Sequence, residues 1–342
     1  MWLKTNTLKL LISDIAFTKM KTILFIIVCF LPLTSNGKVQ VQSCNRWVSF
    51  DAPPKRAVSN DINMTEMLFA LGVQSNMAGY AGITGWHIQT EAFKKQSGSL
   101  LQIAEKYPNM EHLLAIKADF FFAGWNYGLT QGGELTPDSL NKFGIKTYEL
   151  SESCSHIMKK NPGSFEDIYN DIANLGKIFH KETVADTLNQ QFKSQIHALQ
   201  QQIAQRQSTI PVFIYDSGKD APFTGGKYAI AQAMISSAGG INVTEHLNAN
   251  WGQTDWESVA KANPEAIIIV NYGTETSQDK QSFLVNLPVL KETPAIKKQH
   301  FFVLEYNEIT PGIRVFNATE RLAKFLHPAL FARSGSTEQI EP

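Results

Sequence analysis

A long helical pattern of apolar positions occupies residues 181–207. Apolar side chains recur there at steps of four, four, four, three and four residues: Val184, Leu188, Phe192, Ile196, Leu199 and Ile203. This spacing forms one apolar stripe on a helix, and Gln, Lys and Asn occupy the opposite face. At 1.5 Å per residue the helix would be roughly 40 Å long. One small lobe does not need such a length, so we expect a helix that crosses between two domains; a long surface helix on a single domain is the alternative.

Before this helix, the chain alternates between short apolar runs typical of strands and patterns typical of helices. Strands are expected at residues 56–59, 77–80, 119–123 and 147–150. Helices are expected at residues 110–117, 137–143 and 165–179. Another helix follows the first strand; Asn63 or Thr65 can cap it, and Gly72 ends it. Residues 81–99 are expected to form a loop.

After residue 207 the same alternation begins again. Strands are expected at residues 212–215, 266–270 and 301–304, and helices at residues 228–238, 256–262 and 312–326. Alternation of this kind indicates a parallel sheet covered on both faces. The predicted fold class is therefore α/β, with two Rossmann-like lobes joined by one long interdomain α-helix and a ligand cleft between the lobes. The expected boundaries are 1–37 (upstream extension and signal peptide), 38–180 (N-terminal lobe), 181–207 (interdomain helix), 208–332 (C-terminal lobe) and 333–342 (tail).

The N-terminal segment has the pattern of a secretory signal peptide. Two lysines flank Met20, an almost unbroken apolar run follows at residues 22–33, and small polar residues lead to Gly37, where we expect cleavage. The apolar run is too short to span a bilayer. Translation can start at Met1 or at Met20. Cys29 would suggest lipidation, but the residue before it is too large for that cleavage.

Charge and cysteine content fit a secreted globular protein. Lys+Arg and Asp+Glu each number 31 in 342 residues, which argues against a nucleic acid or an anionic membrane surface as partner. Without the signal peptide, Cys44 and Cys154 remain. In an oxidising compartment they are expected to form a disulfide between the N-terminal arm and the end of the first lobe; two buried free thiols are the alternative.

Enzyme motifs are missing from the sequence. It contains no GxSxG elbow, no HExxH, no P-loop lysine motif and no GxGxxG after a strand. The eight histidines are scattered, with no pair at ligand spacing. We therefore expect no catalysis, no cofactor and no resident metal.

Aromatic residues are concentrated in loops after the predicted strands. They are Tyr80, Trp86, Trp125, Tyr127, Phe223, Trp251, Tyr272 and Tyr306. Ligands of open α/β sheets bind beyond the carboxyl ends of the strands, and two facing lobes would turn these loops into the walls of one cleft. Each aromatic could instead pack only against its own loop. We expect at least half of them to line a ligand cleft.

Three stretches of the chain carry a family resemblance. They are AVSN…TEMLFALG at residues 57–72, NMEHLLAIKAD at 109–119, and APFTGGK…AGGIN at 221–242 with WE…NPEAI at 256–267. With them, residues 56–328 resemble periplasmic substrate-binding proteins of the iron-siderophore/cobalamin ABC importer class. The resemblance implies a monomer that captures a metal chelate or corrinoid without catalysis. It also implies transient delivery to a permease dimer with its ATPase subunits, and a rigid interdomain helix.

The resemblance also assigns roles to individual residues. Glu111 and Glu257 match the glutamates with which this class docks the permease, one on each lobe. Either could instead be an acid favoured by the N-terminus of its helix. Trp251 matches a cleft tryptophan of cobalamin-binding members, and Trp125 has a similar position on the first lobe.

The chain differs from the class in the segments that are expected to determine which ligand binds. The loop at 81–99 and the segment 152–154 do not match the general pattern, and only Arg314 could bring a guanidinium to the cleft. A multiply anionic chelate would need several guanidinium partners. We therefore favour a bulky, weakly charged iron chelate or corrinoid held by aromatic stacking, with Glu308 and Arg314 as further ligand-binding residues.

Two other functions remain open at this point. The first is capture of bare zinc or manganese, which would need a converging set of ligands: His87, Glu91, His246 and Glu308. The second is a secreted enzyme acting on a chelate, with carboxylates in the cleft: Glu152, Asp216 and Glu308.

Overall fold

The computed structural model describes residues 37–86 and 89–332. Of these, residues 38–86 and 89–332 belong to one compact unit. Apart from Gly37, the expected signal peptide and upstream extension lie outside the described residues, as do the expected tail at 333–342 and His87. No helix in the two described ranges is both long and apolar enough to cross a bilayer.

The first sheet is parallel and contains the strands expected before residue 150. Its order is β5-β4-β3-β6-β7, and β8 also pairs with β6. The strands are β3 (Ala57–Asn60), β4 (Met77–Ala81), β5 (Leu101–Ala104), β6 (Phe120–Trp125), β7 (Gly128–Leu129) and β8 (Lys146–Glu149). Phe120 and Phe122 lie in the core on one face of the sheet, and Phe121 lies in the core on the other. Burial on both faces explains the three consecutive phenylalanines, because side chains alternate along a strand.

Helices cover both faces of this sheet. One core includes α1 (Ile62–Ala70) and α5 (Phe165–Ile178), and the core on the opposite face includes α3 (Met110–Ala115) and α4 (Pro137–Asn141). All four helices occur where the sequence predicts them.

The N-cap of α1 differs from the prediction. Asp61 caps the helix, in a backbone conformation with φ of 66°, and its side chain accepts from the Ile62 N–H. Asn63 and Thr65 are buried inside the helix. Asn63 donates to the Pro311 carbonyl instead, so its amide connects α1 to a distant segment of the chain.

The prediction of a loop at residues 81–99 is wrong in part. Helix α2 (Glu91–Ser97) lies inside it, capped by the Thr90 hydroxyl, which accepts from the Phe93 N–H. Phe93 is fully buried, and Ser97 is the other buried residue of this helix. With one buried apolar side chain in seven residues, α2 has no repeating apolar pattern from which a helix could be predicted.

The second sheet is also parallel, in the order β11-β9-β13-β14. Its strands are β9 (Ile210–Tyr215), β11 (Gly240–Asn242), β13 (Ala266–Asn271) and β14 (Phe301–Glu305). Beside it, β10 (Phe223–Gly225) and β12 (Trp251–Gln253) form an antiparallel ribbon. The helices of this region are α7 (Ile230–Ser237), α8 (Trp256–Ala262), α9 (Ser277–Val285), α10 (Pro294–Lys297), α11 (Tyr306–Ile309), α12 (Val315–Leu326) and α13 (Pro328–Phe331).

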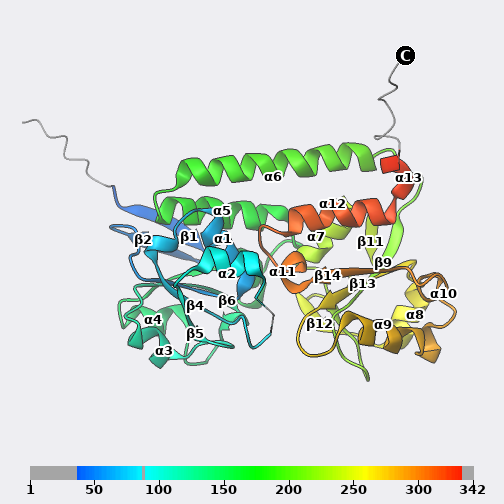
Figure 1. Ribbon diagram of the computed structural model, residues 1–342, viewed down its shortest axis with the longest axis horizontal. Coiled ribbons are helices and arrows are strands. Elements are labelled where there is room, and N and C mark those ends of the chain that lie inside the picture. Colours follow the sequence, from blue (N-terminus) through cyan, green and yellow to red (C-terminus); the bar gives the residue numbers. More distant parts are fainter. Residues whose placement is uncertain (1–36, 87–88, 333–342) are drawn as a thin grey trace, which may run out of the picture. The chain divides into compact units, whose positions relative to one another are not determined.

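The long helix is α6 (Glu182–Ile203), which ends four residues before the predicted boundary at 207. It packs against α5, which precedes it, and against α7 and α12, which follow it; Figure 1 shows it in green across both halves of the molecule. Phe192 of α6 stacks on Phe316 of α12 at 4.1 Å, and Tyr169 of α5 stacks on the same ring at 5.6 Å. Helix α6 thus contacts both halves, while the domain boundaries at 180 and 208 remain a prediction.

The N-terminal arm forms a hairpin of β1 (Val39–Ser43) and β2 (Arg46–Phe50). Cys44 lies at its turn and is bonded to Cys154 in the short helix η2 (Ser151–His156). The predicted disulfide is therefore confirmed, and it joins segments 110 residues apart.

Candidate functional site

An aromatic cavity of about 280 Å³ opens at the carboxyl ends of strands from both sheets. Six of the ten residues predicted to bind ligand line it: Trp86, Tyr127, Phe223, Trp251, Tyr272 and Tyr306. The fold explains the convergence, because loops at the carboxyl ends of parallel strands share one edge of a sheet. We call this space the aromatic cavity.

Pairs of rings form the walls of the aromatic cavity. Phe223 and Trp251 come from neighbouring strands of the β10–β12 ribbon, and their rings stack with centroids 6.3 Å apart. The rings of Tyr272 and Tyr306, which follow β13 and β14, lie 5.7 Å apart. These faces provide flat apolar surfaces on which a planar or bulky ligand can stack.

Two tyrosine hydroxyls of the cavity are held by carboxylates. The Tyr272 hydroxyl donates to Asp216 Oδ2 at 2.7 Å, and the Tyr306 hydroxyl donates to Asp61 Oδ2 at 2.9 Å. Burial and the neighbouring carboxylates raise the pKa of both tyrosines above the ordinary value. Both hydroxyls therefore stay protonated at neutral pH.

Two of the predicted aromatic residues are kept out of the cavity by their own contacts. Tyr80 is buried, packs edge-on against Phe93 and accepts a hydrogen bond from Gln89. Trp125 is also buried, and its indole donates to Glu149 Oε1 at 3.1 Å. Neither side chain is part of the cavity lining.

Glu308 and Arg314 lie outside the aromatic cavity as well. Both line a second cavity of about 450 Å³, which shares Trp86, Tyr272 and Tyr306 with the aromatic cavity. Glu308 pairs with Arg321 at 2.6 Å. Arg314 instead donates to both carboxylate oxygens of Glu66, from Nε and from Nη2.

The aromatic cavity also has a polar part, of which the sequence analysis named only Asp216. Asn126, His156, Asp216 and Asn250 all line the aromatic cavity. Burial lowers the pKa of His156, so its imidazole is neutral at pH 7. Asp216 directly follows the apolar run of β9, and it was one of the carboxylates that the sequence analysis placed in the cleft.

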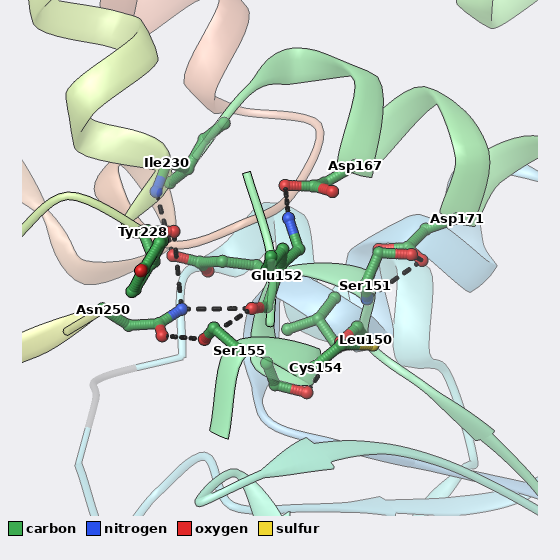
Figure 2. Close-up of polar contacts among 12 residues, drawn as sticks. Leu150, Ser151, Glu152, Cys154, Ser155, Asp167, Asp171, Tyr228, Ile230 and Asn250 are labelled. Atoms are coloured by element: carbon green, nitrogen blue, oxygen red, sulfur yellow. Dashed lines mark hydrogen bonds and ion pairs between the residues drawn. The ribbon is translucent and has the colours of Figure 1, made fainter. Parts of the chain in front are cut away.

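A buried carboxyl lies behind the cavity wall, in η2. Glu152 Oε1 accepts from the Ile230 N–H at 2.9 Å, and the Glu152 carbonyl accepts from the Asn250 amide at 3.2 Å (Figure 2). Asn250 also lines the cavity and is bonded to Ser155. These bonds connect the segment after β8 to α7 and to the ribbon. Burial is the main reason that the pKa of Glu152 is raised to about 8.

The raised pKa of Glu152 predicts a pH-dependent loss of stability. The folded protein keeps this proton while the unfolded chain releases it near pH 4.5, so the free energy of unfolding falls as pH rises from 4.5 to about 8. Glu152→Gln should remove this component, a change of a few kcal/mol in urea unfolding followed across that range. Asp171, whose pKa is raised to about 7 by burial, keeps its contribution of the same sign. Exposed Glu166→Gln is the matched control; a Glu152→Gln profile parallel to wild type would contradict the assignment.

The predicted docking glutamates are exposed and occupy equivalent positions. Glu111 lies in the first turn of α3 and Glu257 in the first turn of α8. In Figure 1 both helices lie on the side of their sheet away from α6. Within the described ranges, neither carboxylate has an ion pair or a side-chain hydrogen bond. They are therefore available to a partner.

The residues suggested for a bare metal do not form a site in the described part of the chain. Glu91 pairs with Lys94 at 2.8 Å, His246 is exposed, and Glu308 pairs with Arg321. Among the described residues, no three His, Cys, Asp or Glu side chains are grouped so that they could hold a metal ion. Of the carboxylates suggested for an enzyme, Asp216 lines the aromatic cavity, whereas Glu152 and Glu308 do not.

Comparison with known proteins agrees with the resemblance found in the sequence. The chain is 26% identical over 223 residues to a vitamin B12-binding protein of Pectobacterium atrosepticum, covering 64% of this chain and 72% of that protein. A periplasmic binding protein from Veillonella parvula superposes with a TM-score of 0.74 at 25% identity, covering 85% of this chain and 98% of that one. The ABC-type Fe3+-hydroxamate transport protein of Saccharomonospora viridis superposes with a TM-score of 0.71 at 19% identity, covering 84% and 98%. At 19% identity, the similarity to the Saccharomonospora viridis protein shows a shared fold and nothing further.

A family model described as periplasmic binding protein matches residues 58–307, which include all of both sheets except Ala57 and all of the aromatic-cavity lining except Thr310. The chain therefore belongs to the periplasmic binding protein family.

Proposed function

We propose that this chain is the solute-binding component of an ABC importer and that it captures a metal chelate or corrinoid. The observation that carries the proposal is the aromatic cavity, in which seven aromatic side chains from both halves of the chain converge, the six predicted ones and Tyr107. The family is a class of binding proteins, so the cavity is proposed to hold its ligand without chemistry.

The lining of the cavity favours a bulky and weakly charged ligand. Among the described residues, no Lys or Arg lines the aromatic cavity. Its volume of about 280 Å³ is close to the lower end of the range for small-molecule sites. A ligand as large as a corrinoid would extend past Trp86, Tyr272 and Tyr306 into the second cavity, which adds about 450 Å³.

The partner in this proposal is an inner-membrane permease dimer with its ATPase subunits. Glu111 and Glu257 are proposed to dock it, one from each half of the chain. The contact would be transient and the binding protein a monomer. A signal peptide cleaved near Gly37 would deliver the protein to the periplasm, and the Cys44–Cys154 disulfide suits that oxidising compartment.

The proposal is tested by tryptophan fluorescence of the mature protein, residues 38–342. Titration with cobalamin, haem and a panel of ferric siderophores should give saturable quenching by one ligand class at micromolar concentration or below. Trp86→Phe and Trp251→Phe should each reduce the quenching, because both rings line the cavity. Trp47, 66% exposed on the hairpin, gives the matched control Trp47→Phe.

A different result would favour the second candidate function. If no chelate quenches while zinc or manganese raises the melting temperature, capture of bare metal would replace the proposal.

A further inference from the structure

Asp216 has an unusual position in the aromatic cavity. It directly follows β9, is 5% exposed and lines the cavity. Its Oδ2 accepts from the Tyr272 hydroxyl at 2.7 Å and from the Ser217 hydroxyl at 2.8 Å. Within the described part of the chain, Oδ1 accepts no hydrogen bond, and it is not among the buried unpaired atoms. One oxygen is therefore fixed, and the other remains accessible.

A buried lysine lies beside this carboxylate, outside the lining. Lys280 is 2% exposed and donates to the main-chain carbonyls of Asp216, at 2.5 Å, and Val270, at 2.7 Å. Its ammonium also lies 4.7 Å from the centre of the Tyr272 ring. Burial raises the pKa of Asp216, and the positive charge of Lys280 opposes this rise, while the ammonium itself is occupied by main-chain oxygens. A ligand in the aromatic cavity can therefore contact the carboxylate of Asp216 but not the ammonium of Lys280.

The second cavity, which adjoins the aromatic cavity, is also lined mainly by negatively charged side chains. Glu275, Glu305 and Glu308 line it, and Arg314 is the cation in its described lining. Arg314 already donates three hydrogen bonds to Glu66. The cations that pair with two of these glutamates, Lys219 and Arg321, are not part of the lining.

We propose that Asp216 determines ligand specificity by accepting a hydrogen bond from an amide, ammonium or hydroxyl group of the ligand, and that ligands presenting a carboxylate at this position are rejected. The inference rests on the proposed function and specifies the ligand class. Oδ1 would lose its access to water when a ligand fills the cavity, and a donor on the ligand would replace that water. A carboxylate on the ligand would place two like charges together at a desolvated site.

The test compares two pairs of ligands, each with one member that offers hydrogen-bond donors and one member that carries carboxylates. Cobinamide, with a periphery of amides, is paired with cobyrinic acid, with a periphery of carboxylates. Ferrioxamine B, with a free ammonium, is paired with its N-succinyl derivative. Calorimetric titration should show wild type binding the donor member of one pair about tenfold to hundredfold more tightly than the acid member. The pair that binds distinguishes a corrinoid from a hydroxamate chelate.

Three variants test whether the preference depends on Asp216. Asp216→Asn keeps the shape of the side chain but removes its charge, so the preference should fall to about threefold or less. Exposed Asp220→Asn makes the same chemical change outside the lining and should keep the wild-type preference. Tyr272→Phe removes one of the two hydrogen bonds that fix Oδ2, so it should weaken the preference while the carboxylate remains. Melting temperatures verify that each variant is folded.

Each outcome decides the matter. Equal binding of both members by wild type, or an unchanged preference in folded Asp216→Asn, would overturn the inference and leave the proposed function standing. Binding of none of the four probes by folded wild type would overturn the inference. Quenching by haem or another siderophore in the fluorescence titration would then leave the proposed function standing, and quenching by no chelate would overturn that function too.

Discussion

Replacing Glu111 and Glu257 together by alanine should abolish uptake and leave ligand affinity unchanged. Both carboxylates are exposed, and neither is part of either cavity lining. If each pairs with a cation of the permease, each loss should reduce transport by about tenfold or more, and the two losses should combine. The measurement is uptake of labelled ligand by cells that depend on this chain, beside calorimetric titration of the purified variant.

The chain offers a close control for the docking prediction. Glu91 and Glu182 are also exposed glutamates in the first turn of a helix, α2 and α6. Their double replacement by alanine makes the same change in charge at the N-termini of two helices. Uptake should remain normal in this control. Normal uptake by the Glu111 and Glu257 variant would refute the docking role, and equal losses in both double variants would point to a general effect of charge.

The parts of the fold that could be predicted are those in which one local pattern decides the outcome. Runs buried on both faces, such as Phe120 to Phe122 in β6 and AIIIV in β13, allow only a central strand. The stripe of α6 extends over enough turns to identify a helix from spacing alone. By contrast, α2 depends on one buried phenylalanine, and β10 and β12 have three residues each. Elements this short are stabilised by tertiary contacts that leave no period in the sequence.

The site was predictable to the extent that position along the chain determines position in space. Trp86, Tyr127 and Tyr272 reach the aromatic cavity because they follow parallel strands. Trp125 also lies at the end of a strand, but its indole turns to the buried Glu149. Glu149 is in turn bonded to Ser43 and Arg46 of the hairpin. The orientation of the Trp125 side chain thus depends on a partner more than 20 positions away in the chain. A single sequence does not show which distant residues come into contact.

The same reasoning changes the expectation for Arg314, which the sequence placed in the ligand cleft. Arg314→Ala should lower the free energy of unfolding by about 3 kcal/mol, because it leaves the Glu66 carboxylate without its cation. The Glu66 side chain is 3% exposed, and Arg314 supplies three of its hydrogen bonds. The fourth comes from the Asn307 amide. Urea unfolding of the variant measures the loss.

Controls separate a structural role of Arg314 from a role in ligand binding. Arg321→Ala breaks a more exposed pair, with Glu308, and should cost less than about 1 kcal/mol. Adding Glu66→Gln to Arg314→Ala removes the stranded charge and should restore part of the lost stability. Because Glu66 belongs to α1 and Arg314 precedes α12, this pair connects the two halves of the chain beside α6. If Arg314→Ala instead weakened ligand binding with stability unchanged, the guanidinium would leave Glu66 for the ligand, and the original prediction from the sequence would stand.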